Sequence, residues 1–188
     1  MYKRQASIAR KLGVIVISHK RNMGKGEALK TGFKYFLKNT DVDIVVVADA
    51  DGQYPIKYVK LLIEPLLKNE ADFVSGYRNW SKVPFRHRLG NFVWKTTFNL
   101  LFGTNFKDTN CGLVGFTRKA LKRVKRTGGG YIIENVLFIE ALKNRFRIKQ
   151  VPVEVRYKSI SPVPRGVRVV LGVWLFILKE GIKFRSGL

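Results

Sequence analysis

Short apolar runs alternate with helical apolar stripes along the first third of the chain, and this pattern predicts an α/β fold. Two β-branched runs, Val14–Ser18 and Ile44–Ala48, have the composition of strands that are buried on both faces. Between them, the apolar residues of Glu27–Leu37 fall on one helical stripe. A strand, a helix and a strand in this order form a parallel pair. We therefore expect a Rossmann-like, mostly parallel sheet flanked by helices.

The same patterns continue through the rest of the chain. The further expected strands are Asp72–Ser75, Val114–Phe116 and Ile148–Arg156. The further expected helices are Pro55–Leu67, Leu89–Phe102, Arg118–Val124 and Glu134–Lys143. Pro152 is expected to break the last strand, and Pro65 to kink the helix that contains it. Gly128–Gly130 is expected to be a flexible turn.

The C-terminal residues form an amphipathic helical pattern. Val169–Leu178 is apolar, and Arg168 and Lys179 bound it. This stretch is shorter than the about 20 apolar residues that a membrane-spanning helix needs. We expect a helix that either lies in a membrane interface or packs on the domain. Because a length of 188 residues favours one domain, residues 1–157 are assigned to that domain and residues 158–188 to a basic, apolar tail.

The chain is strongly basic, with 36 lysines and arginines against 13 acidic residues and a formal net charge of +23. Such a charge attracts nucleic acid, anionic lipid headgroups or phosphorylated substrates. Two stretches, between Asp72 and Asp108 and between Glu154 and Glu180, contain no acidic residue and interleave cations with aromatic rings. Because both kinds of side chain settle at membrane interfaces, the expected partner is an anionic membrane surface, and no specific nucleic acid is expected.

The cysteine content and the N-terminal residues indicate a cytoplasmic location. Cys111 is the only cysteine, which excludes an internal disulfide. The N-terminal residues are basic but lack the apolar core of a signal peptide. Together with the basic charge, this predicts a cytoplasmic protein that is peripheral on the inner face of a membrane.

Two carboxylates follow the second apolar strand. Asp49 and Asp51 come directly after Ile44–Ala48, and Gln53 comes two residues later. Open α/β sheets bind ligands at the carboxyl ends of their strands. Carboxylate and amide oxygens are hard ligands that suit Mg²⁺ or Mn²⁺, and such an ion neutralises a diphosphate leaving group. The segment therefore predicts a metal and diphosphate site.

The segment has two other possible interpretations. A surface turn remains open, because aspartate and glycine favour turns for local reasons. A calcium loop of the EF-hand type is excluded, since Tyr54 and Lys60 stand where that loop requires glycine and glutamate.

A glycine-rich segment, Asn22–Gly26, precedes the first predicted helix of the strand-helix-strand unit. Its two glycines and Lys25 are suited to hold a phosphate at a helix N-terminus. A Walker P-loop is excluded because no glycine occupies position 19 and no Ser or Thr follows Lys25. A dinucleotide fingerprint is excluded because Leu29 replaces its third glycine. A plain glycine-rich helix start remains the alternative.

A third polar segment, Asp108–Gly112, lies before the predicted strand at Val114. An Asp-initiated turn is the alternative to a functional role. Cys111 is expected to be a packed residue, because no histidine is near it in the sequence to activate it as a nucleophile. His19 and His87 are isolated and are not expected to bind a metal.

Six segments, taken in order, resemble glycosyltransferase family 2, and in particular the branch that contains dolichyl-phosphate mannose synthase and other polyprenyl-phosphate glycosyltransferases. The segments are VIVISHKRNMGKGEALKTGF, DIVVVADADGQYP, DFVSGYR, DTNCGLVGFTRKAL, YIIENVLFIEAL and IKQVPVEVRY. The resemblance covers about Ala6 to Tyr157. It implies a GT-A fold and a metal-dependent enzyme that uses a nucleotide-sugar donor.

The resemblance assigns residues to the donor half of such a site. It implies that Asp49, Asp51 and Gln53 hold the divalent ion, Mg²⁺ or Mn²⁺, and the donor diphosphate. It places Asn22 and Lys25 beside the nucleotide.

The resemblance also assigns residues around the acceptor. Arg78 and Arg88 match basic positions that face the phosphates of the donor or the acceptor. Asp108 matches an aspartate on the acceptor side, and Glu134 matches a glutamate on the following helix. Asp51, Asp108 and Glu134 are therefore the expected catalytic residues.

The sequence departs from the family pattern at two places. Family members begin with a strand and a second strand whose acidic motif reads the nucleotide base, and neither precedes Val14 here. We therefore expect an N-terminally truncated chain in which Met1–Gln5 is not the native start. At Tyr157–Pro162 the chain also lacks the arginine and the Gly-x-Ser-Lys stretch that are usual in the lipid-phosphate branch.

The expected function is transfer of a hexose from a nucleotide-sugar of the GDP-mannose or UDP-glucose type to a polyprenyl or dolichyl phosphate, with inversion, at a membrane surface. One alternative is transfer to a sugar hydroxyl of a glycan or glycolipid, with Asp108 or Glu134 as the base. An alternative of another class is a basic nucleic-acid-binding protein, which leaves the carboxylates after the buried strand unexplained. A third is an inactive fragment that lacks half of the nucleotide site.

Overall fold

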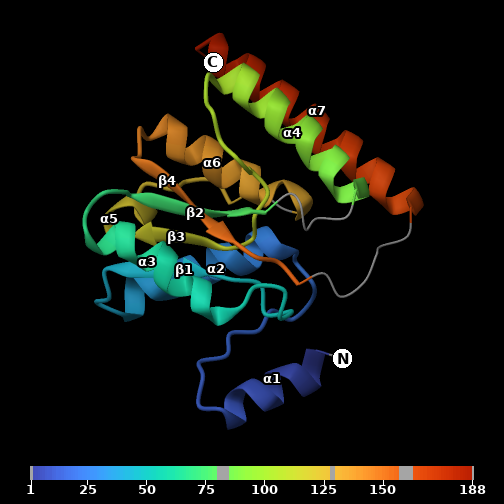
Figure 1. Cartoon of the computed structure of the whole chain (residues 1–188). Helices are drawn as coiled ribbons and strands as arrows, with labels where there is room; N and C mark the ends of the chain where they lie inside the picture. The colour runs from blue at the N-terminus through green and yellow to red at the C-terminus, as the bar shows by residue number, and fades with distance from the viewer. Residues whose placement is uncertain (1, 80–84, 128–129, 157–162, 188) are drawn as a thin grey trace.

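The computed structural model describes residues 2–79, 85–127, 130–156 and 163–187. At its centre is a four-stranded sheet with helices on both faces (Figure 1). The strands are β1 Ile44–Val47, β2 Phe73–Arg78, β3 Val114–Thr117 and β4 Ile148–Val153. The helices are α1 Tyr2–Lys11, α2 Lys25–Asn39, α3 Val59–Leu67, α4 Phe85–Phe102, α5 Arg118–Leu121, α6 Ile133–Lys143 and α7 Val163–Arg185. Two short 3-10 turns, η1 Ile56–Tyr58 and η3 Gly130–Ile132, precede α3 and α6.

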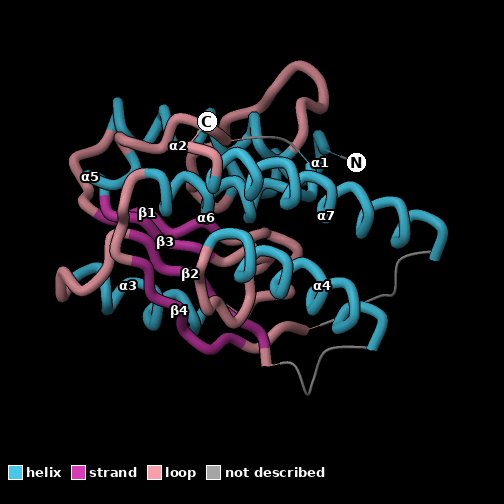
Figure 2. The backbone as a smooth tube through the Cα atoms, turned by 90° about the horizontal axis from the view of Figure 1, so that it is seen from above, coloured by secondary structure: helices cyan, strands magenta, loops and turns pink. Residues whose placement is uncertain are grey.

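The sheet has the strand order β1-β3-β2-β4 (Figure 2). β2 and β4 are parallel, while β3 is antiparallel to both β1 and β2. Three strands therefore run in one direction and β3 runs in the other. This confirms the expected α/β fold with a helix-flanked sheet, and the sheet is mixed, because β3 pairs antiparallel to both of its neighbours. It also brings the carboxyl end of β1 beside the amino end of β3, where Val47 pairs with Val114.

Successive residues of the strands point into two hydrophobic cores on opposite faces of the sheet, as the two-residue period of a strand requires. Val45, Val47 and Phe73 face the larger core, which α2, α4, α6 and α7 cover. Val46 and Val74 face the smaller core, which α3 covers. Both faces of the sheet are thus closed by helices, which explains why the strands read as continuous apolar runs.

Helices α4 and α7 lie side by side and form an outer layer over the larger core (Figures 1 and 2). The indole N–H of Trp94 donates to the carbonyl of Val170 at 2.9 Å, and that of Trp174 donates to the hydroxyl of Thr97 at 3.1 Å. Further along, a Cβ on Gly181 would lie 2.6 Å from the Cβ of Leu101, so glycine allows the close approach. Because these contacts advance together along both helices, α4 and α7 are parallel.

Two predictions about strands are wrong. Val14–Ser18 forms no strand, and its apolar residues Val14, Ile15 and Ile17 are exposed. A strand requires a neighbouring backbone to pair with, and no strand of the described residues lies beside this segment. The strand near the C-terminus is not broken at Pro152, which pairs with Tyr77 inside β4. Because β4 is at the edge of the sheet, the N–H that proline lacks is not needed there.

Two other expectations concern segments that are only partly described. Of the predicted turn Gly128–Gly130, only Gly130 is described, and it begins η3. The Tyr157–Pro162 stretch, where the sequence departs from the family pattern, lies outside the described residues.

Candidate functional site

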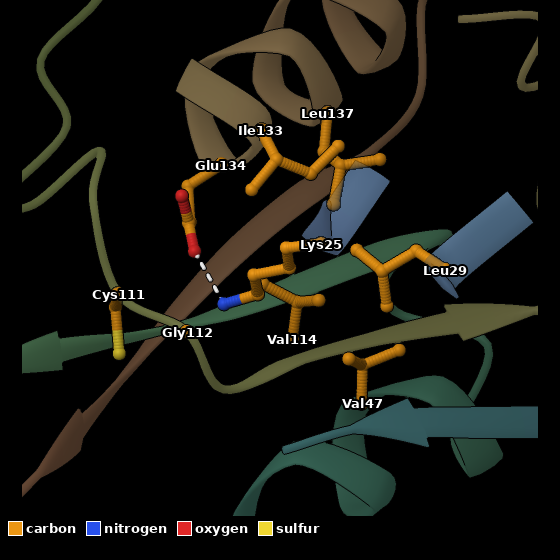
Figure 3. A pocket seen from close by; sticks show the side chains of 9 residues that line it. All are labelled: Lys25, Leu29, Val47, Cys111, Gly112, Val114, Ile133, Glu134 and Leu137. Atoms are coloured by element: carbon orange, nitrogen blue, oxygen red, sulfur yellow. Dashed lines mark hydrogen bonds and ion pairs between the residues drawn. The ribbon is translucent and has the colours of Figure 1, made fainter. Parts of the chain in front are cut away.

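Three charged side chains from separate elements meet beyond the end of β1. Lys25 is the first residue of α2, Asp49 follows β1 by two residues, and Glu134 lies in the first turn of α6. The Lys25 Nζ is 2.8 Å from the Asp49 carboxylate and 2.8 Å from Glu134 Oε1. Figure 3 shows the Lys25 and Glu134 side chains pointing toward one another across a pocket between α2, β1, β3 and α6. We call these three residues the charged triad.

The charged triad is partly shielded from water. The side chains of Lys25 and Asp49 are 31% and 37% exposed, and that of Glu134 is 12% exposed. Burial acts to lower the pKa of the Lys25 ammonium, but the Glu134 carboxylate and the hydrogen bonds to Asp49 and Glu134 raise that pKa by more, so it lies above its ordinary value. Lys25 is therefore a cation at neutral pH.

The absence of a side chain at Gly112 leaves space for the charged triad. A Cβ on Gly112 would lie 2.5 Å from Asp49 Oδ2 and 3.4 Å from the Lys25 Nζ. The Asp49 carboxylate therefore packs directly against the backbone of Gly112, just before β3. The Gly112 N–H donates to the hydroxyl of Tyr54 at 3.1 Å. Burial raises the pKa of the Tyr54 hydroxyl above its ordinary value, so it stays neutral and can accept this bond.

Cys111, next to that glycine, is fully buried. Burial is the main reason that its pKa rises to about 12, so the thiol is protonated at neutral pH. The expectation that Cys111 is a packed residue is confirmed.

Asp51 and Gln53 continue the loop after Asp49. Gly52 has a positive φ of 74°, which favours glycine at this turn. The Asp51 Oδ1 accepts from the backbone N–H of Gln53 at 2.9 Å, and the Gln53 carbonyl accepts from the backbone N–H of Arg156 at 2.9 Å. The turn predicted as an alternative is therefore present, and it holds the two carboxylates on one loop.

The oxygens of this loop fit a divalent ion that is shared with a substrate. Asp49, Asp51 and Gln53 provide hard oxygen donors from one short segment. Among the described residues, no group of three or more His, Cys, Asp and Glu side chains could hold a metal by itself. Mg²⁺ and similar ions are commonly bound by one or two carboxylates together with water and substrate phosphates. The donor set therefore suits an ion that arrives with a diphosphate.

A second polar cluster contains Arg78 and Asp108, which the sequence had assigned to the phosphates and to the acceptor. The Arg78 Nε and Nη2 donate to the Asp108 carboxylate at 2.6 and 2.9 Å, and Nη2 also donates to Asn91 Oδ1 at 2.7 Å. The three side chains are buried, with Asp108 only 1% exposed. In this state the guanidinium of Arg78 is directed to Asp108 and not to the charged triad.

A chain of hydrogen bonds runs from the Arg78 cluster to α6, to the residue next to Glu134. The Asp108 Oδ1 accepts from the backbone N–H of Asn110 at 2.9 Å, and Asn110 Oδ1 accepts from the Asn135 amide at 3.3 Å. Asn135 follows Glu134 in α6. Within the described part of the chain, the buried oxygens Asn135 Oδ1 and Thr109 Oγ1 have no hydrogen-bond partner. Such atoms are expected to bind water or a ligand.

Two predicted binding residues lie elsewhere. Asn22 is exposed, and its Oδ1 accepts from the backbone N–H of Gly24 at 2.9 Å, which shapes the start of α2. Arg88 is exposed on α4. Among the described residues, neither side chain hydrogen-bonds to the charged triad or to the Arg78 cluster.

The sequence did not point to three residues that the structure places in the site: Tyr54, Asn91 and Asn135. Asn91 and Asn135 occupy core-facing positions of α4 and α6, where apolar residues are the rule. A buried asparagine within a helical apolar stripe is the signal that could have identified them. Tyr54 has no such signal, because a tyrosine before a proline is ordinary in a loop.

One protein family and several known proteins match this chain. The family described as Glycosyl transferase family 2 matches residues 3–125. An uncharacterized protein of Methanocaldococcus jannaschii is 33% identical over 174 residues, which cover 89% of this chain and 71% of the relative. The UDP-N-acetylglucosamine–dolichyl-phosphate N-acetylglucosaminyltransferase of Methanococcus voltae is 32% identical over 174 residues, which cover 87% of this chain and 67% of the relative.

The fold also has solved neighbours. Glucosyl-3-phosphoglycerate synthase from Mycobacterium tuberculosis, in complex with phosphoglyceric acid, has a TM-score of 0.71 and 24% identity, and the match covers 91% of this chain. A complex of that enzyme with Mn²⁺, uridine diphosphate and phosphoglyceric acid has a TM-score of 0.65 and 22% identity. The present chain spans 62% and 56% of these two structures. The likeness shows a common GT-A fold.

The Arg78 cluster generates a stability prediction. Replacing Arg78 by methionine leaves the buried Asp108 carboxylate without its cation, so the free energy of unfolding should fall by about 3–5 kcal/mol. Urea denaturation followed by circular dichroism measures this change. As a control, Lys149→Met removes an exposed lysine that pairs with Glu70 at 2.6 Å, and it should leave the stability close to that of wild type. Equal stability of the two variants would contradict a structural role for Arg78.

Proposed function

The chain belongs to glycosyltransferase family 2, and we propose that it transfers a hexose from a nucleotide-sugar to a polyprenyl or dolichyl phosphate, with inversion, at an anionic membrane surface. The observation that carries the proposal is the meeting of Lys25, Asp49 and Glu134 at the end of β1, beside the loop that also contains Asp51 and Gln53. This arrangement supplies oxygens for an ion and one cation for a diphosphate. UDP-linked sugars are the first donors to test, because a named relative uses UDP-N-acetylglucosamine.

In the proposed reaction, Asp49, Asp51 and Gln53 hold the divalent ion, Mg²⁺ or Mn²⁺. When bound, this ion offsets the negative charge that develops on the leaving diphosphate. An oxygen of the acceptor phosphate, already anionic at neutral pH, forms the new bond to the anomeric carbon. The bond from that carbon to the diphosphate oxygen breaks, and its electron pair stays on the diphosphate. No proton is transferred, and the configuration inverts in one displacement.

The alternative acceptor, a sugar hydroxyl, would require a base to accept its proton. Glu134 suits this role better than Asp108, because Glu134 lines the pocket while Asp108 is buried against Arg78. The basic charge and the outer helices favour the lipid phosphate.

The outer layer of α4 and α7 supports the membrane part of the proposal. None of the described helices is long and apolar enough to cross a bilayer. On the side away from the core, however, the two helices expose a set of large apolar residues, here called the outer face: Leu89, Phe92, Leu100, Leu171, Leu175 and Ile182. The exposed cations Arg168 and Lys179 lie on the same side of α7. Apolar residues beside cations match the boundary between acyl chains and anionic headgroups.

The transfer itself is tested with the whole chain, Mn²⁺, UDP-N-acetylglucosamine, UDP-glucose or GDP-mannose, and vesicles that contain polyprenyl phosphate. Asp51→Ala should reduce transfer at least about 100-fold, because it removes charge stabilisation of the leaving group. Asp41→Ala, at an exposed aspartate before β1, should keep wild-type activity. Transfer that survives unchanged in Asp51→Ala would contradict the mechanism.

Membrane binding is tested by sedimentation with vesicles of phosphatidylglycerol and phosphatidylcholine. The double variant Leu171→Gln, Leu175→Gln should lower the fraction bound to anionic vesicles about tenfold or more, because each leucine loses apolar burial. Leu67→Gln, which changes an even more exposed leucine on α3 across the sheet, serves as the control. If both variants bind like wild type, and the protein instead binds RNA with a steep salt dependence and no response to Mn²⁺ with a nucleotide-sugar, the nucleic-acid alternative is favoured.

A further inference from the structure

Lys25 contacts a carboxylate that the proposed metal ion also needs. Its ammonium touches the carboxylate of Asp49, which is the first oxygen ligand of the proposed ion site, at 2.8 Å. A lysine ammonium and a divalent ion that approach the same carboxylate repel one another, and the repulsion is stronger where water is partly excluded. A divalent ion can bind Asp49 fully only if the ammonium gives up that contact.

Glu134 provides a place for the ammonium to remain. Its Oε1 lies 2.8 Å from the Lys25 Nζ, and its side chain is the less exposed of the two carboxylates. Lys25 is also the first residue of α2, where the helix dipole disfavours a cation. The two carboxylates compensate for this position, and a third anion at the same point would be bound by the ammonium and by the helix N-terminus together.

We propose that Lys25 is a resident counter-ion of the donor site, which holds Asp49 until a divalent ion displaces it and then binds the donor diphosphate while it stays in contact with Glu134. The inference rests on the proposed function for the identity of the ligands. In this proposal Lys25 couples the binding of the ion to the binding of the diphosphate. The ion releases the ammonium from Asp49, and the diphosphate then binds the released ammonium. Such a coupling is reciprocal, so each ligand tightens the binding of the other.

The test uses Mn²⁺ and UDP, titrated into the whole chain by calorimetry, with free Mn²⁺ also followed by electron paramagnetic resonance. In Lys25→Met, Mn²⁺ alone should bind about three- to tenfold more tightly than in wild type, because the competing charge is gone. UDP at saturating Mn²⁺ should bind at least about threefold more weakly, because the Lys25 ammonium that binds its diphosphate is gone. The two effects have opposite signs, which a general loss of structure would not produce.

Two further variants control the experiment. Lys25→Arg keeps the competing charge, so it should not show the tighter Mn²⁺ binding expected of Lys25→Met. Lys30→Met removes the same charge from the same helix, where Lys30 pairs only with Glu27 at 3.6 Å in the contacts described, and it should change neither affinity. Thermal melting verifies that each variant is folded.

Two results would overturn the inference. One is Mn²⁺ binding in folded Lys25→Met that is equal to or weaker than in wild type. The other is equal tightening in Lys30→Met, which would show a nonspecific effect of net charge. Because the titrations contain neither sugar nor acceptor, a wild-type protein that binds both ligands but transfers no sugar would count against the proposed function and leave this inference intact.

Discussion

The ion pairs of Lys25 with Asp49 and Glu134 are the interaction on which the site depends. They join the start of α2, the loop after β1 and the start of α6 at one point. The antiparallel β3 makes this possible, because it brings Gly112 against Asp49 where any larger residue would push the carboxylate away. Two carboxylates so close to each other need a cation between them, and the chain provides its own.

The sequence predicted much of the fold because the strands are covered on both faces and read as apolar runs. Val45 to Val47 and Phe73 to Val74 alternate between two cores, so every residue is apolar. Val14–Ser18 has the same composition but no neighbouring strand in the described residues, and composition alone cannot reveal a missing partner. Asp49 was placed correctly at the end of its strand. The contact of Lys25 with Glu134, which completes the charged triad, was not predictable, because these two residues are 109 positions apart and only the topology brings them together.

Helix α4 connects the polar site to the outer face. Its Asn91 is buried and accepts a hydrogen bond from Arg78, while the adjacent Phe92 is exposed on the outer face. One helix therefore contacts the Asp108 cluster on one side and presents apolar residues on the other. The sequence predicted Arg78 and Asp108 as separate binding and catalytic residues, whereas the structure pairs them in a buried ion pair. Arg78 and Asp108 are 30 positions apart in the sequence, so predicting their ion pair requires knowing which ends of the strands lie together.

A crystal structure of the protein with Mn²⁺ and UDP tests the role of the charged triad. We expect an ion within about 2.3 Å of carboxylate oxygens from Asp49 and Asp51, the usual distance for a hard cation. We also expect that the Lys25 ammonium has left Asp49, contacts the diphosphate and still contacts Glu134. An ion and diphosphate bound away from the loop after β1, with the three charged residues unchanged, would contradict this role of Lys25.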